Sequence, residues 1–117
     1  MIVRVALDEG GLTGRITAET TFPPDDWRNE YFGGDRPRQV QEHVAALAAD
    51  LGIGTEDVSE QALRFVLSAP EVSTVIVGMR SVGNVERNTA LSGRPLSPDR
   101  RALLARHRWE RNFYLPA

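Results

Sequence analysis

Several residues suited to binding an anion cluster in the segment GMRSVGNVERN, which runs from Gly78 to Asn88. Gly78 lets the backbone come close to a ligand at the end of an apolar run. Ser81 would cap the following helix, whose first N–H groups make an anion site, and the Arg80 guanidinium suits a phosphate or stacking on adenine. Asn84 and Asn88 are one helical turn apart, so both amides can face one ligand. The same spacing also fits a plain strand–turn–helix with solvated polar side chains.

A second candidate lies near the N-terminus, in the segment LDEGGLTGR. Its three glycines, at positions 10, 11 and 14, allow a backbone to approach a phosphate closely, and Arg15 follows them. Asp8 and Glu9 would repel that phosphate unless their side chains point away. The pattern GG-x-x-G is also typical of a generic flexible loop, so both interpretations stay open.

The remaining polar residues indicate no catalytic or metal site. His43 is expected on a solvated helix face, His107 at a helix end, and the pair Asp25–Asp26 in solvent beside Trp27. Two distant histidines and the absence of Cys give no metal-ligand cluster. All 14 basic residues are Arg. That excludes a lysine general acid, a Schiff base and a P-loop lysine within this chain.

Size and charge narrow the class of protein. The 117 residues suffice for one small domain. A formal net charge of −2 argues against a nucleic-acid or anionic-membrane partner. No apolar run approaches the length of a membrane span, and the N-terminus lacks the apolar region of a signal peptide. We therefore expect a cytoplasmic protein.

Two apolar runs that lead into the candidate sites predict β-strands. They are IVRVAL (Ile2–Leu7) and VSTVIV (Val72–Val77), and the second is typical of a strand buried on both faces of a parallel sheet. Residues 8–37 are predicted to form one long loop, broken by glycines and by Pro23–Pro24. Four aromatic residues within it (Phe22, Trp27, Tyr31 and Phe32) indicate that this loop packs on something.

Four helices are predicted from apolar periodicity and end signals. They cover Arg38–Leu51, about Val58–Ala69, about Val82–Leu91, and residues 98–107 after Ser97, with Gly52 capping the first and Pro70 stopping the second. Residues 107–117 form an aromatic, irregular tail. The order β, loop, α, α, β, α, α predicts an α/β fold with parallel strands.

Three collinear blocks of this sequence resemble the C-terminal third of aldo-keto reductases. They are RVALDEGGLTGR (4–15), ALRFVLSAPEVSTVIVGMRSVGNVERN (62–88) and HRWERNFY (107–114). That family folds as a (β/α)₈ TIM barrel and binds NADP at the C-terminal ends of its strands. The resemblance implies one partial barrel domain over residues 1–117. It would hold the last two strand–helix units, the seventh and eighth, plus a C-terminal helix and the tail.

The resemblance also implies which residues contact NADP(H). The positions that match the family's cofactor contacts are Leu7, Glu9, Arg15, Gly78, Arg80, Ser81, Asn84 and Asn88. Those from Gly78 onward match the contacts to the 2′-phosphate and adenine. The earlier ones match contacts to the pyrophosphate, with Arg15 where a Lys is common. The chain departs from the family pattern at Val77, where many members have Pro, and at Arg87, where several have an acid.

The aromatic tail has two interpretations. Trp109, Phe113 and Tyr114 match a family tail that borders the substrate pocket. A role in packing alone is equally consistent with their positions.

The resemblance also implies that this chain lacks the family's catalytic residues. The family transfers hydride to a carbonyl with a Tyr acid helped by Lys, Asp and His, all in the first half of the barrel. Tyr31 and Tyr114 do not match that Tyr, and the chain has no Lys. We expect a reductase fragment that carries the NADP(H)-binding segment and is inactive alone. Met1 stands just before a barrel strand, which fits a truncated reading frame.

Other functions stay open at this point. One is a non-catalytic nucleotide-binding or regulatory module, and another is one half of a split reductase. Two parallel strands cannot close a barrel or cover their own edges. We therefore expect a homo-oligomer or a complementing chain, unless the protein aggregates or folds as a loose helical domain with a residual strand pair.

Overall fold

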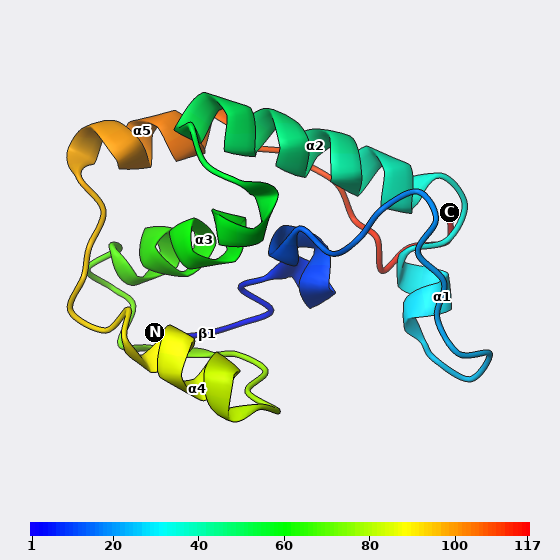
Figure 1. Cartoon of the computed structure of the whole chain (residues 1–117), viewed down its shortest axis with the longest axis horizontal. Coiled ribbons are helices and arrows are strands. Elements are labelled where there is room, and N and C mark those ends of the chain that lie inside the picture. The colour runs from blue at the N-terminus through cyan, green and yellow to red at the C-terminus, as the bar shows by residue number, and fades with distance from the viewer.

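A computed structural model describes all residues, 1–117, as a small α/β structure. In Figure 1, α2 and α5 lie end to end along the top, α3 lies beneath them, and β1 lies between α3 and α4. In chain order the elements are β1 (Ile2–Arg4), the 3₁₀ helix η1 (Asp8–Thr13), α1 (Arg28–Tyr31), α2 (Arg36–Leu51), the 3₁₀ helix η2 (Thr55–Asp57), α3 (Val58–Leu67), β2 (Thr74–Ile76), α4 (Val82–Thr89) and α5 (Pro98–Arg106).

The two strands pair in parallel, as the order of elements predicted. Ile2 lies opposite Thr74, and Arg4 lies opposite Ile76. Both strands are shorter than their apolar runs. β1 ends before Val5, whose φ of 58° leaves the extended region. A left-handed residue cannot continue a strand, so the sheet keeps three residues per strand.

The run Val72–Val77 is typical of a strand buried on both faces, but here it pairs with one strand alone and leaves apolar surface exposed, as expected for two parallel strands without neighbours. Ile76 remains 63 % exposed, and Ile2 on the paired strand remains 65 % exposed. Only the middle residues of the strands, Val3 and Val75, are partly covered. The reason is that the sheet has only two strands, so no further strand covers either edge.

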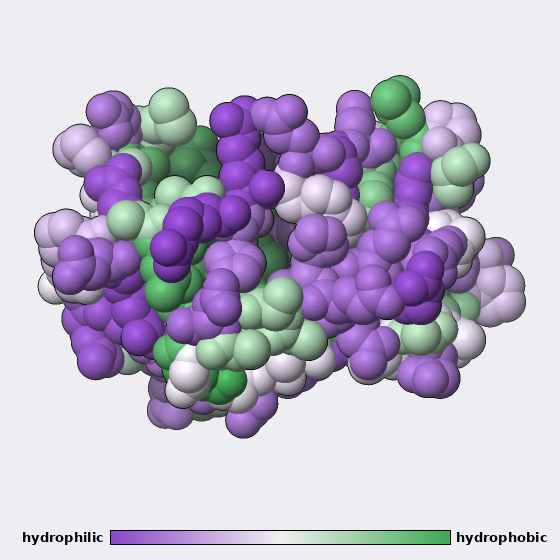
Figure 2. Space-filling view, turned by 90° about the horizontal axis from the view of Figure 1, so that it is seen from above, coloured by the Kyte–Doolittle hydropathy of each residue, from purple (hydrophilic) through white to green (hydrophobic).

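The core lies instead between α2 and the segments on either side of it. The predicted apolar positions of α2, which are Val40, Val44, Leu47 and Leu51, are all buried. They pack with other buried residues from the η1 region, α1, α3 and the tail, namely Ile16, Tyr31, Phe32, Val58 and Phe113. Gly52 ends α2 in the left-handed conformation, as predicted for a C-cap. The outer face formed by α2 and α5 is mostly hydrophilic, with smaller apolar patches (Figure 2).

The segment 8–37, predicted as one long loop, contains two short helical pieces. The glycines do not prevent η1, because Gly10 adopts a positive φ at a kink inside it. α1 follows, and α2 begins at Arg36, within the predicted loop. The aromatic residues of the segment do pack on something, as predicted. Phe22 stacks on Phe32 with ring centroids 5.7 Å apart, and Tyr31 meets Phe113 edge to face.

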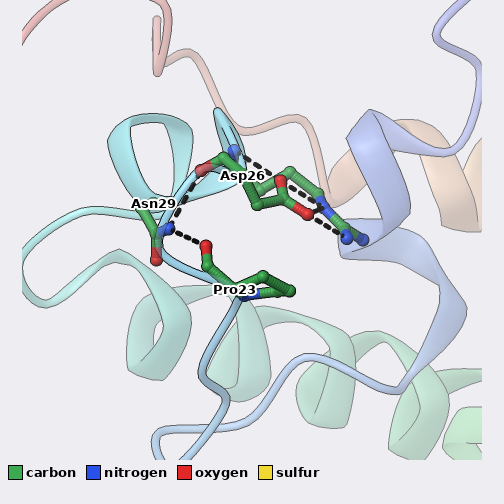
Figure 3. A network of polar contacts seen from close by, with 4 residues as sticks. Pro23, Asp26 and Asn29 are labelled. Carbon is green, nitrogen blue, oxygen red and sulfur yellow. Dashed lines mark hydrogen bonds and ion pairs between the residues drawn. The ribbon is translucent and has the colours of Figure 1, made fainter.

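The start of α1 is fixed by a polar network (Figure 3). The Asp26 carboxylate accepts hydrogen bonds from the backbone N–H of Arg28 at 2.9 Å and from its Nε at 2.9 Å. The Asn29 amide donates to the carbonyls of Pro23 and Asp26. The bonds from Arg28 lower the pKa of Asp26 to about 2. The prediction that Asp26 is solvated was therefore wrong, whereas Asp25 is exposed.

The later helices begin where their caps predicted. Ser81 accepts a hydrogen bond from the Asn84 N–H at the start of α4, and Ser97 accepts one from Arg100 at the start of α5. α3 and α4 each end two residues before the predicted end, at Leu67 and Thr89.

One buried cation joins the two ends of the fold. Arg36, at the first position of α2, is only 8 % exposed. Its Nη1 donates to the carbonyls of Tyr31 at 3.1 Å and Phe113 at 2.9 Å, and its Nη2 donates to that of Leu115 at 2.7 Å. The guanidinium also lies over the Phe113 ring, 4.6 Å from its centroid. Arg36 therefore fastens the tail to α1 and α2.

We predict that Arg36→Met destabilises the protein by about 2 kcal/mol, because the tail carbonyls lose their charged donor. The same substitution at Arg38, which is exposed and pairs with Asp35 and Glu42, should change stability little. Urea unfolding followed by circular dichroism measures both. Equal midpoints for the two variants would show that Arg36 does not fasten the tail.

Candidate functional site

Two adjoining hollows lie at the C-terminal ends of β1 and β2. The first has a volume of 400 Å³ and is lined by Leu7, Thr13, Gly14, Arg15, Glu56, Asp57, Ser59, Glu60, Gly78, Asn84, Arg87, Asn88, Ala90, Leu91 and Arg94. The second has a volume of 650 Å³ and is lined by Arg4, Val5, Ala6, Leu7, Glu9, Gly10, Thr13, Trp27, Arg28, Ile76, Val77, Gly78, Arg80 and Asn84. Because Leu7, Thr13, Gly78 and Asn84 line both, the two hollows form one continuous surface depression.

The fold brings seven of the eight predicted cofactor-binding residues to these hollows. Leu7, Gly78 and Asn84 line both hollows, Arg15 and Asn88 line the first, and Glu9 and Arg80 line the second. Ser81 lines neither. Its hydroxyl oxygen accepts the Asn84 N–H at 3.2 Å and so serves the helix itself.

Two elements present these residues from opposite walls. The turn after β2 and α4 supply Gly78, Asn84 and Asn88, all of which line the first hollow. The segment after β1 supplies the other wall. Gly14 is required there, because its φ is +74° and a Cβ would lie 2.4 Å from the Thr55 carbonyl oxygen. This close contact seats the end of η1 against η2.

Charges of both signs surround the first hollow. Arg15, Arg87 and Arg94 line it, and the Arg87 Nη2 donates to the Asn84 side-chain oxygen at 2.6 Å. That bond leaves the Asn84 amide hydrogens free for a ligand. Arg87 thus adds a cation to the first hollow.

Three acids also line the first hollow, and the sequence analysis did not foresee them there. Glu56, Asp57 and Glu60 come from η2 and the start of α3. Glu56 and Asp57 follow Thr55, in a pattern that is typical of the first turn of a helix. Their proximity to α4 depends on how α3 packs, so no local sequence signal could have found it.

A third cavity, of 480 Å³, lies under the tail, and Val5, directly after β1, lines both this cavity and the second hollow. Its walls include Asp8, Tyr31, Val44, Trp109 and Phe113. Trp109, Phe113 and Tyr114 pack against α1 and α2 and also border this cavity. The tail aromatics therefore have a packing role in this chain.

The two histidines lie near this third cavity. His43 is exposed, as predicted, and its ring stacks on Trp109 with centroids 3.7 Å apart. The tail returns over α2 and brings Trp109 to it. The His107 Nε2 lies 2.8 Å from an Asp50 carboxylate oxygen, at the end of α5. The structure contains no cluster of His, Asp or Glu residues that could hold a metal ion.

Tyr31 is the most perturbed titratable group in this region. Its hydroxyl donates to the Asp8 carboxylate at 2.6 Å. Burial, and then this bond to Asp8, raise the pKa of Tyr31 to about 12. A phenol with a raised pKa is a weaker acid, so Tyr31 is not tuned to give up a proton near neutral pH.

A polar groove thus lies across the ends of two parallel strands. Comparison with known families shows to which family the chain belongs. Residues 1–108 match the aldo/keto reductase family. The chain belongs to this family. The match spans every helix and strand of the structure, including both walls of the hollows. No curated protein and no solved structure gave a match. None of the helices combines the length and apolar character that crossing a membrane requires.

Membership of the aldo/keto reductase family places this chain among oxidoreductases. The parallel pairing of β1 and β2, with helices between and after them, gives an α/β fold. The α/β class predicted from the order of elements is therefore confirmed. The chain has only two strands, so a barrel is not formed by these residues.

We predict that stability falls at high pH through Tyr31. Its pKa is about 12 in the folded protein and near 10 when unfolded, so the folded state binds this proton more tightly. The resulting stabilisation is present below pH 10 and is lost as the pH rises from 10 through 12. We expect a loss of about 1–2 kcal/mol across that window. Tyr31→Phe should be less stable at pH 8 but should show a flatter decline. Urea midpoints from pH 8 to 11.5 measure this, and parallel declines would contradict it.

Proposed function

We propose that this chain carries the NADP(H)-binding segment of an aldo/keto reductase, and that it does not reduce carbonyls alone. The observation that carries the proposal is the convergence of seven family-matched positions on two joined hollows. These positions come from segments about seventy residues apart in the sequence. In this proposal β1 and β2 are the last two strands of a (β/α)₈ barrel, the strands beside which such enzymes commonly bind phosphates.

The residues present suit the parts of a dinucleotide. Arg80, which is exposed and forms no ion pair, would hold the 2′-phosphate or stack on the adenine, and Asn84 and Asn88 would bond the base. The backbone from Leu7 to Gly10 and the Arg15 guanidinium would face the pyrophosphate. Bound NADPH would supply a hydride.

The carboxylates beside that turn do not oppose this assignment. Asp8 lines the third cavity, under the tail, and lines neither the first nor the second hollow. The Glu9 carboxylate accepts a hydrogen bond from the Tyr114 hydroxyl at 2.9 Å. The partners of both carboxylates lie outside the two hollows, and the ion pair with Arg111 offsets the Asp8 charge.

Carbonyl reduction also needs a proton donor, and this chain does not offer a suitable one. Both tyrosine hydroxyls donate to carboxylates, Tyr31 to Asp8 and Tyr114 to Glu9. Burial and the bond to Asp8 raise the pKa of Tyr31, and the bond to Glu9 raises the pKa of Tyr114. The chain also has no Lys that could lower a tyrosine pKa. In this proposal the chain binds the cofactor but does not itself supply the catalytic proton donor.

We predict that NADPH binds this chain saturably and that Arg80→Met weakens NADPH binding about tenfold, with a smaller effect on NADH. The control is Arg106→Met, since Arg106 is exposed on α5 and lines no hollow described here. Calorimetric titration measures each affinity. Absence of heat at millimolar NADPH for the unmodified chain would refute the proposal. Aldehyde-dependent NADPH oxidation by the chain alone would refute the proposed inactivity.

A second candidate, one half of a split reductase, is favoured by the exposed sheet. Ile2 and Ile76 leave most of their surface in water, and both sheet edges are unpaired. A complementing chain or a second copy would cover them. A regulatory module that binds the nucleotide without chemistry would share the same site.

We predict that the chain self-associates when no complementing chain is present, because burying this apolar sheet face and pairing its edges is favourable. Sedimentation equilibrium should give masses above the 13.0 kDa of one chain. Ile76→Arg should shift the distribution toward the monomer, while Arg106→Met should leave it unchanged. A strictly monomeric profile at all concentrations would exclude self-association.

A further inference from the structure

The turn at the start of η1 has an unusual backbone. Asp8 and Glu9 both have a φ of 55°, in the left-handed region that residues other than glycine seldom adopt. Two successive residues of this kind cost free energy, so other contacts must hold them in place. The backbone of this turn borders the proposed cofactor site through Leu7, Glu9 and Gly10.

The contacts that hold the turn come mainly from the tail. Arg111 forms an ion pair with Asp8 at a site where both side chains are mostly buried. The Tyr114 hydroxyl donates to Glu9 at 2.9 Å. From α1, the Tyr31 hydroxyl adds a bond to Asp8 at 2.6 Å. Each of the two strained residues therefore has its carboxylate bonded to the tail.

Arg111 is itself firmly seated. Its guanidinium lies 3.8 Å from the ring centroid of Phe113 and 4.4 Å from that of Trp109. These aromatic faces fix the direction in which the guanidinium meets Asp8. On the other side of Asp8, Gly11 leaves the necessary room, because a Cβ there would lie 2.5 Å from the Asp8 Oδ2.

We propose that Arg111 and Tyr114 are positioning residues for NADP(H) binding. They hold the Asp8–Glu9 turn so that its backbone faces the cofactor, and Arg111 neutralises the Asp8 carboxylate on the tail side. This inference rests on the proposed function. It extends the site to residues beyond position 108, where the family match ends.

The test compares NADPH affinities of single and double variants by calorimetry. Arg111→Met frees the Asp8 charge, and we expect NADPH to bind about five- to tenfold more weakly. Adding Asp8→Asn to Arg111→Met removes that charge, so affinity should recover by about threefold, although the turn still lacks its ion pair. Tyr114→Phe should weaken binding less, because it frees an exposed carboxylate. The matched control is Arg108→Met, since Arg108 lies in the same tail but is 78 % exposed.

The double variant separates electrostatic positioning from a purely structural role. If Arg111 only stabilised the tail, Asp8→Asn would not restore affinity, and the inference would be overturned. It would also be overturned if Arg111→Met bound NADPH as tightly as the unmodified chain, while the proposed function would stand.

A second measurement needs no cofactor. The amides of Gly10 and Leu12 donate to the Leu7 carbonyl at 3.0 and 3.1 Å. Their hydrogen exchange should quicken in Arg111→Met and not in Arg108→Met. Unchanged exchange would show that the tail does not hold the turn. If exchange quickens but the unmodified chain binds no NADPH, the proposed function fails and the cofactor role of Arg111 fails with it.

Discussion

The structure depends on one buried cation, Arg36. Taking a guanidinium out of water is costly, and here carbonyl oxygens from α1 and the tail offset that cost. Two of those carbonyls, of Phe113 and Leu115, lie more than seventy residues away in the sequence. Arg36 therefore fixes the path of the tail. The placement of Arg111 beside Asp8, and of the aromatic wall around the third cavity, follows from that path.

The stable part of the molecule and the proposed site are built differently. α2, α1 and the tail form an apolar core in which Val40 and Val58 are almost fully buried. The strand ends that form the site belong instead to a short sheet with open edges and exposed faces. A member of the aldo/keto reductase family with this division keeps a shaped groove at its strand ends, although its two strands do not close a barrel.

Much of the site was predictable because its pieces are local. Ser81 as a helix cap, Gly52 as a C-cap, and the shared face of Asn84 and Asn88 follow from spacing within one or two helical turns. The acids that line the first hollow were not predictable, since Glu56 reaches α4 only through the packing of α3. The stacking of His43 on Trp109 likewise joins residues from distant segments.

The sequence alone determined the order of elements, the parallel α/β class, the apolar face of α2 and the membership in a reductase family, because these rest on periodicity, end signals and motifs. The tertiary structure decided how long the strands are and what covers them. The apolar runs at Ile2–Leu7 and Val72–Val77 predicted longer, buried strands, but Val5 leaves the extended region and no third strand is present. The tertiary structure also decided that the Asp8 carboxylate pairs with Arg111. Local sequence cannot specify this partner, because Arg111 lies about a hundred residues further along the chain and reaches Asp8 only through the fold.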